Sequence, residues 1–191
     1  MNTNVIGESI ENFHKAFKGQ PGNIVSKVFK KFTPENYFVF TLESGKTTHS
    51  YTVSEDKIEE SGIKLALTEV IREHCHSLLG VFKEQNLDSR FRILCRVEFY
   101  LSKGHGMSLG EKTEELRMDE NGNLIEPEFM DSVQKGIELA ENGGKVMIIY
   151  DFDMEIDATS DFKLHAPLTK FYIEIEKKHG YSKTSKKVLR Y

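Results

Sequence analysis

The chain has 191 residues, a length typical of one domain, and it can bury a core without disulfide or metal cross-links. With 26 basic and 30 acidic residues its formal net charge is −4, so composition gives no general attraction for nucleic acid or anionic membranes. The two cysteines exclude a disulfide framework, and no run approaches the ~20 apolar residues of a membrane-spanning helix. We therefore expect a cytoplasmic protein without a secretory signal.

The N-terminal quarter is expected to form a helix, a strand and a hairpin. Apolar residues recur at helical spacing over 4–18, and β-branched and aromatic residues dominate 24–32. Two further β-rich runs, 37–43 and 47–53, are separated by a short loop that contains Gly45. This spacing predicts a β-hairpin.

The middle of the chain is expected to form a long helix and a second strand pair. One apolar face extends through 58–85, and residues 61–62 can separate its first turn. Strict alternation predicts a half-buried strand over 91–101. A glycine-rich loop and a shorter strand at 113–118 follow, and the sequence at 119–122 is typical of a turn.

The C-terminal part is expected to contain a helix and two more strands. Pro127 suits the first turn of a helix, and residues 142–144 suit its end. Residues 145–157 and 171–176 alternate as strands. The tail at 177–191 is basic and lacks apolar periodicity, so we expect it to be loosely held.

The order of these elements predicts an α+β fold. We expect a mainly antiparallel sheet, with two longer helices and the N-terminal helix packed on one face. Residues 1–176 would form a single domain, with a join near 86–90 if there are two subdomains, and residues 177–191 would form the tail.

The chemistry is concentrated on the strand at 145–157, whose second half sets an apolar face against a row of acids. These acids are Asp151, Asp153, Glu155 and Asp157. Acids two apart on a strand are separated by ~7 Å. At that distance unit charges repel by about 2.4 kcal/mol at an effective dielectric constant of 20. A half-buried row therefore needs cations, and Arg92 and Arg96 on a neighbouring strand would supply them.

Two other sources of positive charge stay open at this stage. A divalent metal would bind Asp151 and Asp153 together with Glu174 or Glu176 of the last strand. A basic protein partner would bind the row through complementary charge. The Asp-x-Asp pattern is similar to the strand acids of nucleotidyltransferases, but the spacing from the preceding Gly-Gly pair differs and we do not assign that family.

Three smaller motifs have simpler interpretations. His74 and His76 cannot share a metal from one helix, because residues two apart point in different directions. The loop 103–106 lacks the strand and helix that flank a phosphate-binding loop, so we expect a flexible hairpin loop. If the loop has a function, His105 would act in it as a general acid or base. Residues 119–123 lack the ligand spacing of a calcium loop.

No complete catalytic constellation is present, so a binding role is favoured over catalysis. We expect a protein-interaction module of a cytosolic bacterial protein, such as an immunity protein or antitoxin, that binds a basic partner through Asp151, Asp153, Glu155 and Asp157. No cofactor is expected, and nucleic acid and membranes are not expected as partners. The alternative is a metal-dependent nucleotidyl- or phosphotransfer enzyme with Asp151, Asp153 and Glu174 as metal ligands.

Overall fold

A computed structural model describes residues 35–85, 90–101, 107–159 and 162–180 of the chain. The predictions of a helix over 4–18 and a strand over 24–32 lie outside these residues. The same is true of the loop at 103–106 and of the tail beyond residue 180.

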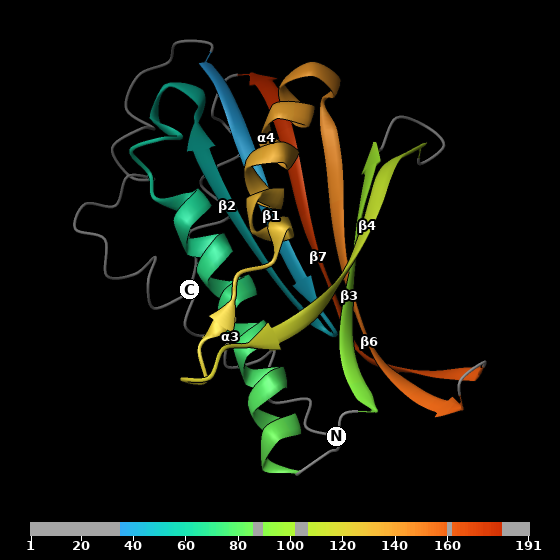
Figure 1. The fold of residues 1–191 in the computed structure, drawn as a ribbon. Helices are drawn as coiled ribbons and strands as arrows, with labels where there is room; N and C mark the ends of the chain where they lie inside the picture. The colour runs from blue at the N-terminus through green and yellow to red at the C-terminus, as the bar shows by residue number, and fades with distance from the viewer. Residues whose placement is uncertain (1–34, 86–89, 102–106, 160–161, 181–191) are drawn as a thin grey trace.

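The described elements form a sheet of long strands with two helices (Figure 1). In chain order they are β1 (Glu35–Ser44), β2 (Thr47–Ser54), the 3-10 turn η1 (Glu55–Lys57), α3 (Ile63–Glu84), β3 (Phe91–Leu101), β4 (Met107–Met118), β5 (Leu124–Ile125), the 3-10 turn η2 (Glu128–Asp131), α4 (Ser132–Gly143), β6 (Lys145–Thr159) and β7 (Phe162–Gly180).

All seven strands join one antiparallel sheet in the order β2-β1-β7-β6-β3-β4-β5. Strand β6, which carries the row of acids, lies at the centre of this order. The predicted α+β class with an antiparallel sheet is confirmed, and the sheet dominates the described fold. No helix in the described parts of the chain is long and apolar enough to cross a membrane.

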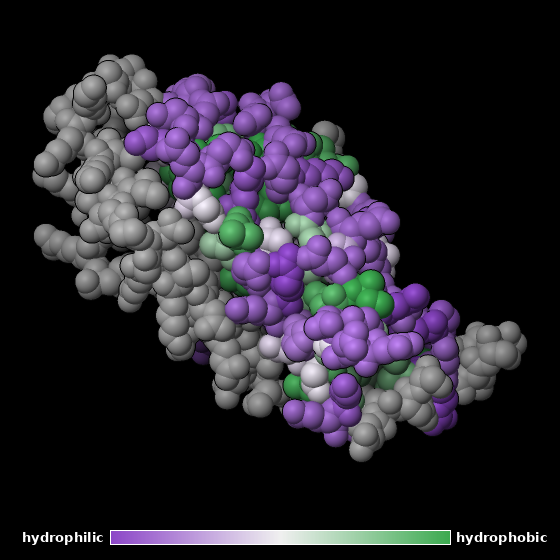
Figure 2. Space-filling view, turned by 60° about the vertical axis from the view of Figure 1, so that its left-hand side comes forward, coloured by the Kyte–Doolittle hydropathy of each residue, from purple (hydrophilic) through white to green (hydrophobic). Residues whose placement is uncertain are grey.

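Helices α3 and α4 cover one face of the sheet (Figure 1). Beneath them lies a continuous core, whose largest fully buried side chains are Tyr150, Phe38, Phe40, Phe152, Leu42, Ile63, Leu67, Ile71, Ile148, Ile173 and Ile175. On the side seen in Figure 2, hydrophilic side chains cover most of the described surface, and hydrophobic ones gather in small patches. The main hydrophobic core therefore lies between the sheet and the two helices.

Two glycines set the positions of the helices. Gly62 precedes α3 with φ 71, a left-handed conformation that most residues avoid, and it separates α3 from the preceding turn as the sequence indicates. On α4, a Cβ at Gly136 would lie 2.7 Å from Ile148 Cδ1 and 2.8 Å from Ile175 Cδ1. The missing side chain therefore lets α4 lie close against β6 and β7.

Several strands are longer than their sequence patterns predict. Strand β4 begins at Met107 rather than at 113, and β7 spans 19 residues from Phe162 rather than starting at 171. Residues 162–166 do alternate apolar and polar side chains, but the run is short and Pro167 interrupts it, so the predicted start of the strand is too late. This early part of β7 pairs with β6 along its length. β7 also continues to Gly180, four residues into the predicted tail.

One buried residue of α3 is polar and has no hydrogen-bond partner. The His74 ring is 1% exposed, and neither of its nitrogens is hydrogen-bonded within the described residues. Its ring meets Phe152 and Phe171 edge-on, with centroid distances of 4.9 and 5.4 Å. Burial lowers the pKa of His74 to about 4, so the ring is neutral in the core at neutral pH.

This arrangement predicts that stability depends on pH through His74. Above its unfolded-state pKa of about 6.5 the ring is neutral in both states. As the pH falls from there to about 4, the unfolded chain takes up a proton that the folded chain does not. The free energy of unfolding should therefore fall by on the order of 3 kcal/mol from this residue. Urea denaturation of wild type and His74→Leu between pH 7 and pH 4 measures the difference.

The matched control is His76→Leu, because His76 is exposed on the same helix. That variant should keep the pH dependence of the wild type, whereas His74→Leu should lose the part due to the buried ring. Equal slopes for wild type and His74→Leu would show that the buried ring does not control acid stability.

Candidate binding face

Strand β6 separates an apolar side from an acidic side. Its alternate residues Val146, Ile148, Tyr150 and Phe152 are each 0% exposed beneath the helices. The acids predicted as site residues point to the opposite side of the sheet, which we call the outer face. Neither α3 nor α4 lies on the outer face (Figure 1).

Asp151 is held by cations from both neighbouring strands. The register places it opposite Arg96 of β3 and Lys170 of β7. Arg96 Nη2 and Lys170 Nζ each lie 3.0 Å from Asp151 Oδ2. Partial burial raises the pKa of Asp151, but hydrogen bonds from Lys170 and Arg96 outweigh this effect and hold the pKa below its ordinary value. The carboxylate is thus ionised and shared between two cations.

Glu155 is the most buried acid of the row, at 6% exposure. Its Oε1 forms an ion pair with Arg92 Nη2 at 2.8 Å and accepts a hydrogen bond from Lys163 Nζ at 3.1 Å, and its Oε2 lies 3.7 Å from His165 Nε2. The same Arg92 nitrogen lies 2.7 Å from Asp157 Oδ2. Burial of a charge is costly unless it is paired, so these contacts explain why Glu155 can lie inside the face.

Asp153 differs from its neighbours because the register gives it no cation. Leu94 lies opposite on β3 and Pro167 opposite on β7. Within the described parts of the chain Asp153 forms no ion pair, and its side chain is partly exposed. Its carboxylate therefore keeps its full capacity to accept hydrogen bonds from another molecule.

A β-bulge in β7 brings its basic residues to the outer face. The register with β6 shifts between Phe152 and Asp153, where β7 has Leu168 as an extra residue. One extra residue reverses which side chains point outward. Lys163 and Lys170 lie on either side of the bulge in β7, and without the extra residue their side chains would point to opposite faces of the sheet. With the bulge, both reach the acids of β6.

The three residues of the metal alternative do not meet. Glu174 pairs with Met147 and forms a 2.6 Å ion pair with Lys145. Asp151 lies four positions after Met147 on β6, a distance of about 13 Å along the strand. Within the described residues, no group of three or more His, Cys, Asp or Glu side chains is placed to hold a metal ion. No observation therefore favours the metal-dependent enzyme.

Next to the acids the outer face carries an apolar patch that sequence reasoning did not single out. Met147 lies opposite Tyr100, and Ile149 lies opposite Tyr172. These four residues, which we call the apolar patch, come from three adjacent strands; Ile149 is 9% exposed, and the other three side chains are partly exposed. Alternation placed some of them on this side, but only the register shows that they are neighbours.

The other motifs have structural roles where they are described. His74 lies in the core and His76 is exposed on the same helix. Asp119 Oδ1 accepts hydrogen bonds from the backbone of Asn121 at 2.9 Å and of Asn123 at 2.8 Å. These bonds close the predicted turn between β4 and β5. Hydrogen bonds to its carboxylate from the Asn123 side chain and backbone lower the pKa of Asp119.

No protein-family model matches the chain, and the curated proteins and the solved structures that were searched gave no match either. The function is therefore argued from the site alone.

The two central acids offer a matched test of the ion pairs. Glu155→Gln should lower the free energy of unfolding by about 1.5–3 kcal/mol, because charge-assisted hydrogen bonds to a buried carboxylate are lost. Asp153→Asn, on the same face of the same strand, should change it by less than about 0.5 kcal/mol. Urea denaturation at pH 7 measures both. Equal losses would mean that the ion pairs do not stabilise the strand.

Proposed function

We propose that this protein is an interaction module that binds a basic protein partner through the outer face, centred on Asp151, Asp153, Glu155 and Asp157. The observation that carries the proposal is Asp153, an acid at the centre of the face that forms no ion pair with any residue that the structure describes and has Arg96 only at longer range. A partner's lysine or arginine would supply the missing charge.

The charges around Asp153 support a partner of this sign. Asp151 and Glu155 flank it along β6, and Asp157 is a further acid at the end of the row, with a side chain that is 39% exposed. Carboxylates have about four acceptor positions each, so those already paired can accept further donors. Complementary charge of this kind speeds the encounter and selects the partner more than it adds affinity.

The apolar patch adds hydrophobic contact area, which the charged residues alone do not provide. Tyrosine and methionine are enriched in protein interfaces, where burial of such side chains provides much of the binding free energy. The patch adjoins the acids, since Asp151 follows Ile149 on the same face of β6. A partner that covers both regions would bury apolar surface while its basic groups meet the carboxylates.

An immunity protein or antitoxin that neutralises a basic toxin is one kind of protein that works in this way. Such a protein needs a rigid, preformed surface and no catalytic group. The central strands of an antiparallel sheet offer that rigidity, because each is hydrogen-bonded on both sides. This more specific role rests on analogy of fold and charge.

The proposal predicts which charge reversals abolish capture of a partner. We expect wild-type protein to capture a basic protein from a lysate of its own host at low salt and to release it as salt rises. Asp153→Lys combined with Asp157→Lys should reduce capture at least tenfold, because the partner's cations would meet lysines. Affinity purification with quantitative mass spectrometry measures the change.

The control is Glu84→Lys combined with Glu141→Lys, two exposed positions at helix ends. It neutralises the formal net charge of −4 equally, so it separates the effect of the face from that of overall charge. The control should unfold at a denaturant concentration close to that of wild type, whereas Asp157→Lys also removes the ion pair with Arg92, so urea denaturation must show that this variant is folded before capture is compared. A basic partner retained equally by the two variants would exclude the outer face as its binding surface.

A further inference from the structure

A pocket of about 680 Å³ lies on the helix side of the sheet, away from the outer face. Its floor is apolar and is formed by Val97 and Phe99 of β3 with Phe129 and Met130 of η2. All four side chains are buried. The volume falls within the ~300–1,000 Å³ typical of small-molecule sites, which combine an apolar lining with a few polar groups.

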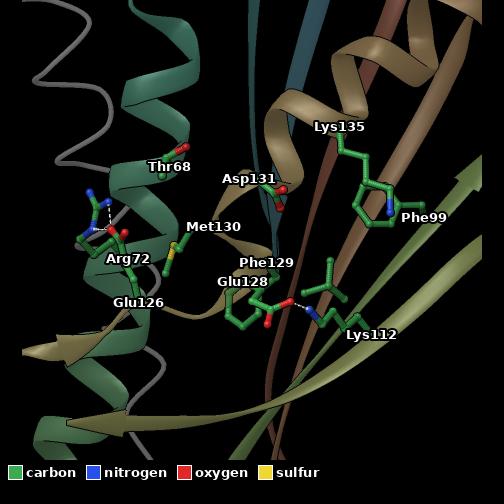
Figure 3. A pocket seen from close by; sticks show the side chains of 11 residues that line it. Thr68, Arg72, Phe99, Lys112, Glu126, Glu128, Phe129, Met130, Asp131 and Lys135 are labelled. Carbon is green, nitrogen blue, oxygen red and sulfur yellow. Dashed lines mark hydrogen bonds and ion pairs between the residues drawn. The ribbon is translucent and has the colours of Figure 1, made fainter. Parts of the chain in front are cut away.

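Most charges at the rim of this pocket are already paired (Figure 3). On one side Arg72 Nε donates to Glu126 Oε1 at 2.9 Å. On another side of the pocket, Lys112 of β4 forms an ion pair with Glu128 of η2. Within each pair the two charges neutralise each other, and each cation also lies against a second acid, Glu69 for Arg72 and Glu114 for Lys112. Neither cation is therefore free to bind a ligand.

Two charges of opposite sign remain, one immediately before α4 and one near the start of this helix. Asp131 is the residue that precedes α4, and its side chain makes no capping hydrogen bond. Lys135 Nζ lies 4.7 Å from the centroid of the Phe99 ring. Neither forms an ion pair with any residue that the structure describes. Both residues line the pocket.

We propose that this pocket binds a zwitterionic small molecule with an apolar group, of the class of the aromatic α-amino acids. Its ammonium group would meet Asp131, its carboxylate would meet Lys135, and its side chain would lie on the floor beside Phe99 and Phe129. The ring of Phe99 holds the Lys135 ammonium in place before binding, which reduces the entropy lost when the ligand binds.

The pair of unneutralised charges selects against simpler ligands. A plain organic anion that reached Lys135 would also meet the carboxylate of Asp131, and a plain amine at Asp131 would meet the ammonium of Lys135. The repulsion between like charges brought close together in the pocket would weaken the binding of either molecule. A molecule that carries both groups on one carbon atom satisfies both residues at once, which is the arrangement in an α-amino acid.

L-phenylalanine is the probe that tests this inference, titrated into the full chain and followed by amide NMR spectra. Saturable shifts are expected at Phe99, Phe129 and Lys135. The analogues 3-phenylpropionate, which lacks the ammonium, and 2-phenylethylamine, which lacks the carboxylate, should each bind at least tenfold more weakly.

Two variants assign each charge to its residue. Asp131→Asn should remove the preference for L-phenylalanine over 3-phenylpropionate, and Lys135→Gln should remove the preference over 2-phenylethylamine. Lys46→Gln, an exposed change in the β1–β2 turn, is the control and should leave both preferences intact. Because the preferences are ratios measured on one folded protein, a small loss of stability does not imitate them.

Three results would overturn the inference: no saturable shift with L-phenylalanine, equal affinity for 3-phenylpropionate, or shifts confined to residues outside the pocket. None of them bears on the outer face, which lies on the other side of the sheet. Conversely, failure to capture a basic partner would leave the ligand titration unaffected.

Discussion

Strand β6 lies at the centre of the sheet, so the side chains on both of its faces must be stabilised, and the two faces are stabilised by different interactions. On one face Tyr150 and Phe152 are fully buried under the helices. On the other, a half-buried row of carboxylates is stable only where cations from the neighbouring strands reach it. Arg92 and Arg96 from β3 and the lysines of β7 provide these cations. The arrangement of the whole sheet around β6 follows from meeting both demands.

The exception within this row gives the outer face its proposed role. Leu94 and Pro167 stand opposite Asp153, where a fully neutralised row would have a basic residue. The cost is modest because Asp153 remains partly hydrated. One carboxylate with spare capacity, bordered by an apolar patch, distinguishes a surface suited to binding from one that is only charge-balanced.

Sequence alone predicted the elements whose residues alternate or repeat strongly. These elements are the β1–β2 hairpin, the long helix α3 and strands β3 and β6. The alternation of side chains along β3 also predicted that Arg92 and Arg96 face the acids of β6, and the register confirms it. Sequence alone did not predict the first half of β7, because Pro167 and the bulge at Leu168 interrupt the alternation that begins at Phe162. The contribution of Lys163 depends on a bulge at Leu168, and the pocket depends on residues from separate elements. Neither leaves a periodic signal in the sequence.

The place of β7 between β1 and β6 has a consequence for the order of folding. β1 pairs with β2 beside it in sequence and with β7 at the far end of the described chain. Closing that long separation costs chain entropy before the contact stabilises anything. As the ribosome releases the chain, the β1–β2 hairpin therefore has no inner neighbour until β7 has emerged. Until then the edge of β1 that pairs with β7 has no such partner, and unpaired strand edges make a nascent chain prone to aggregation.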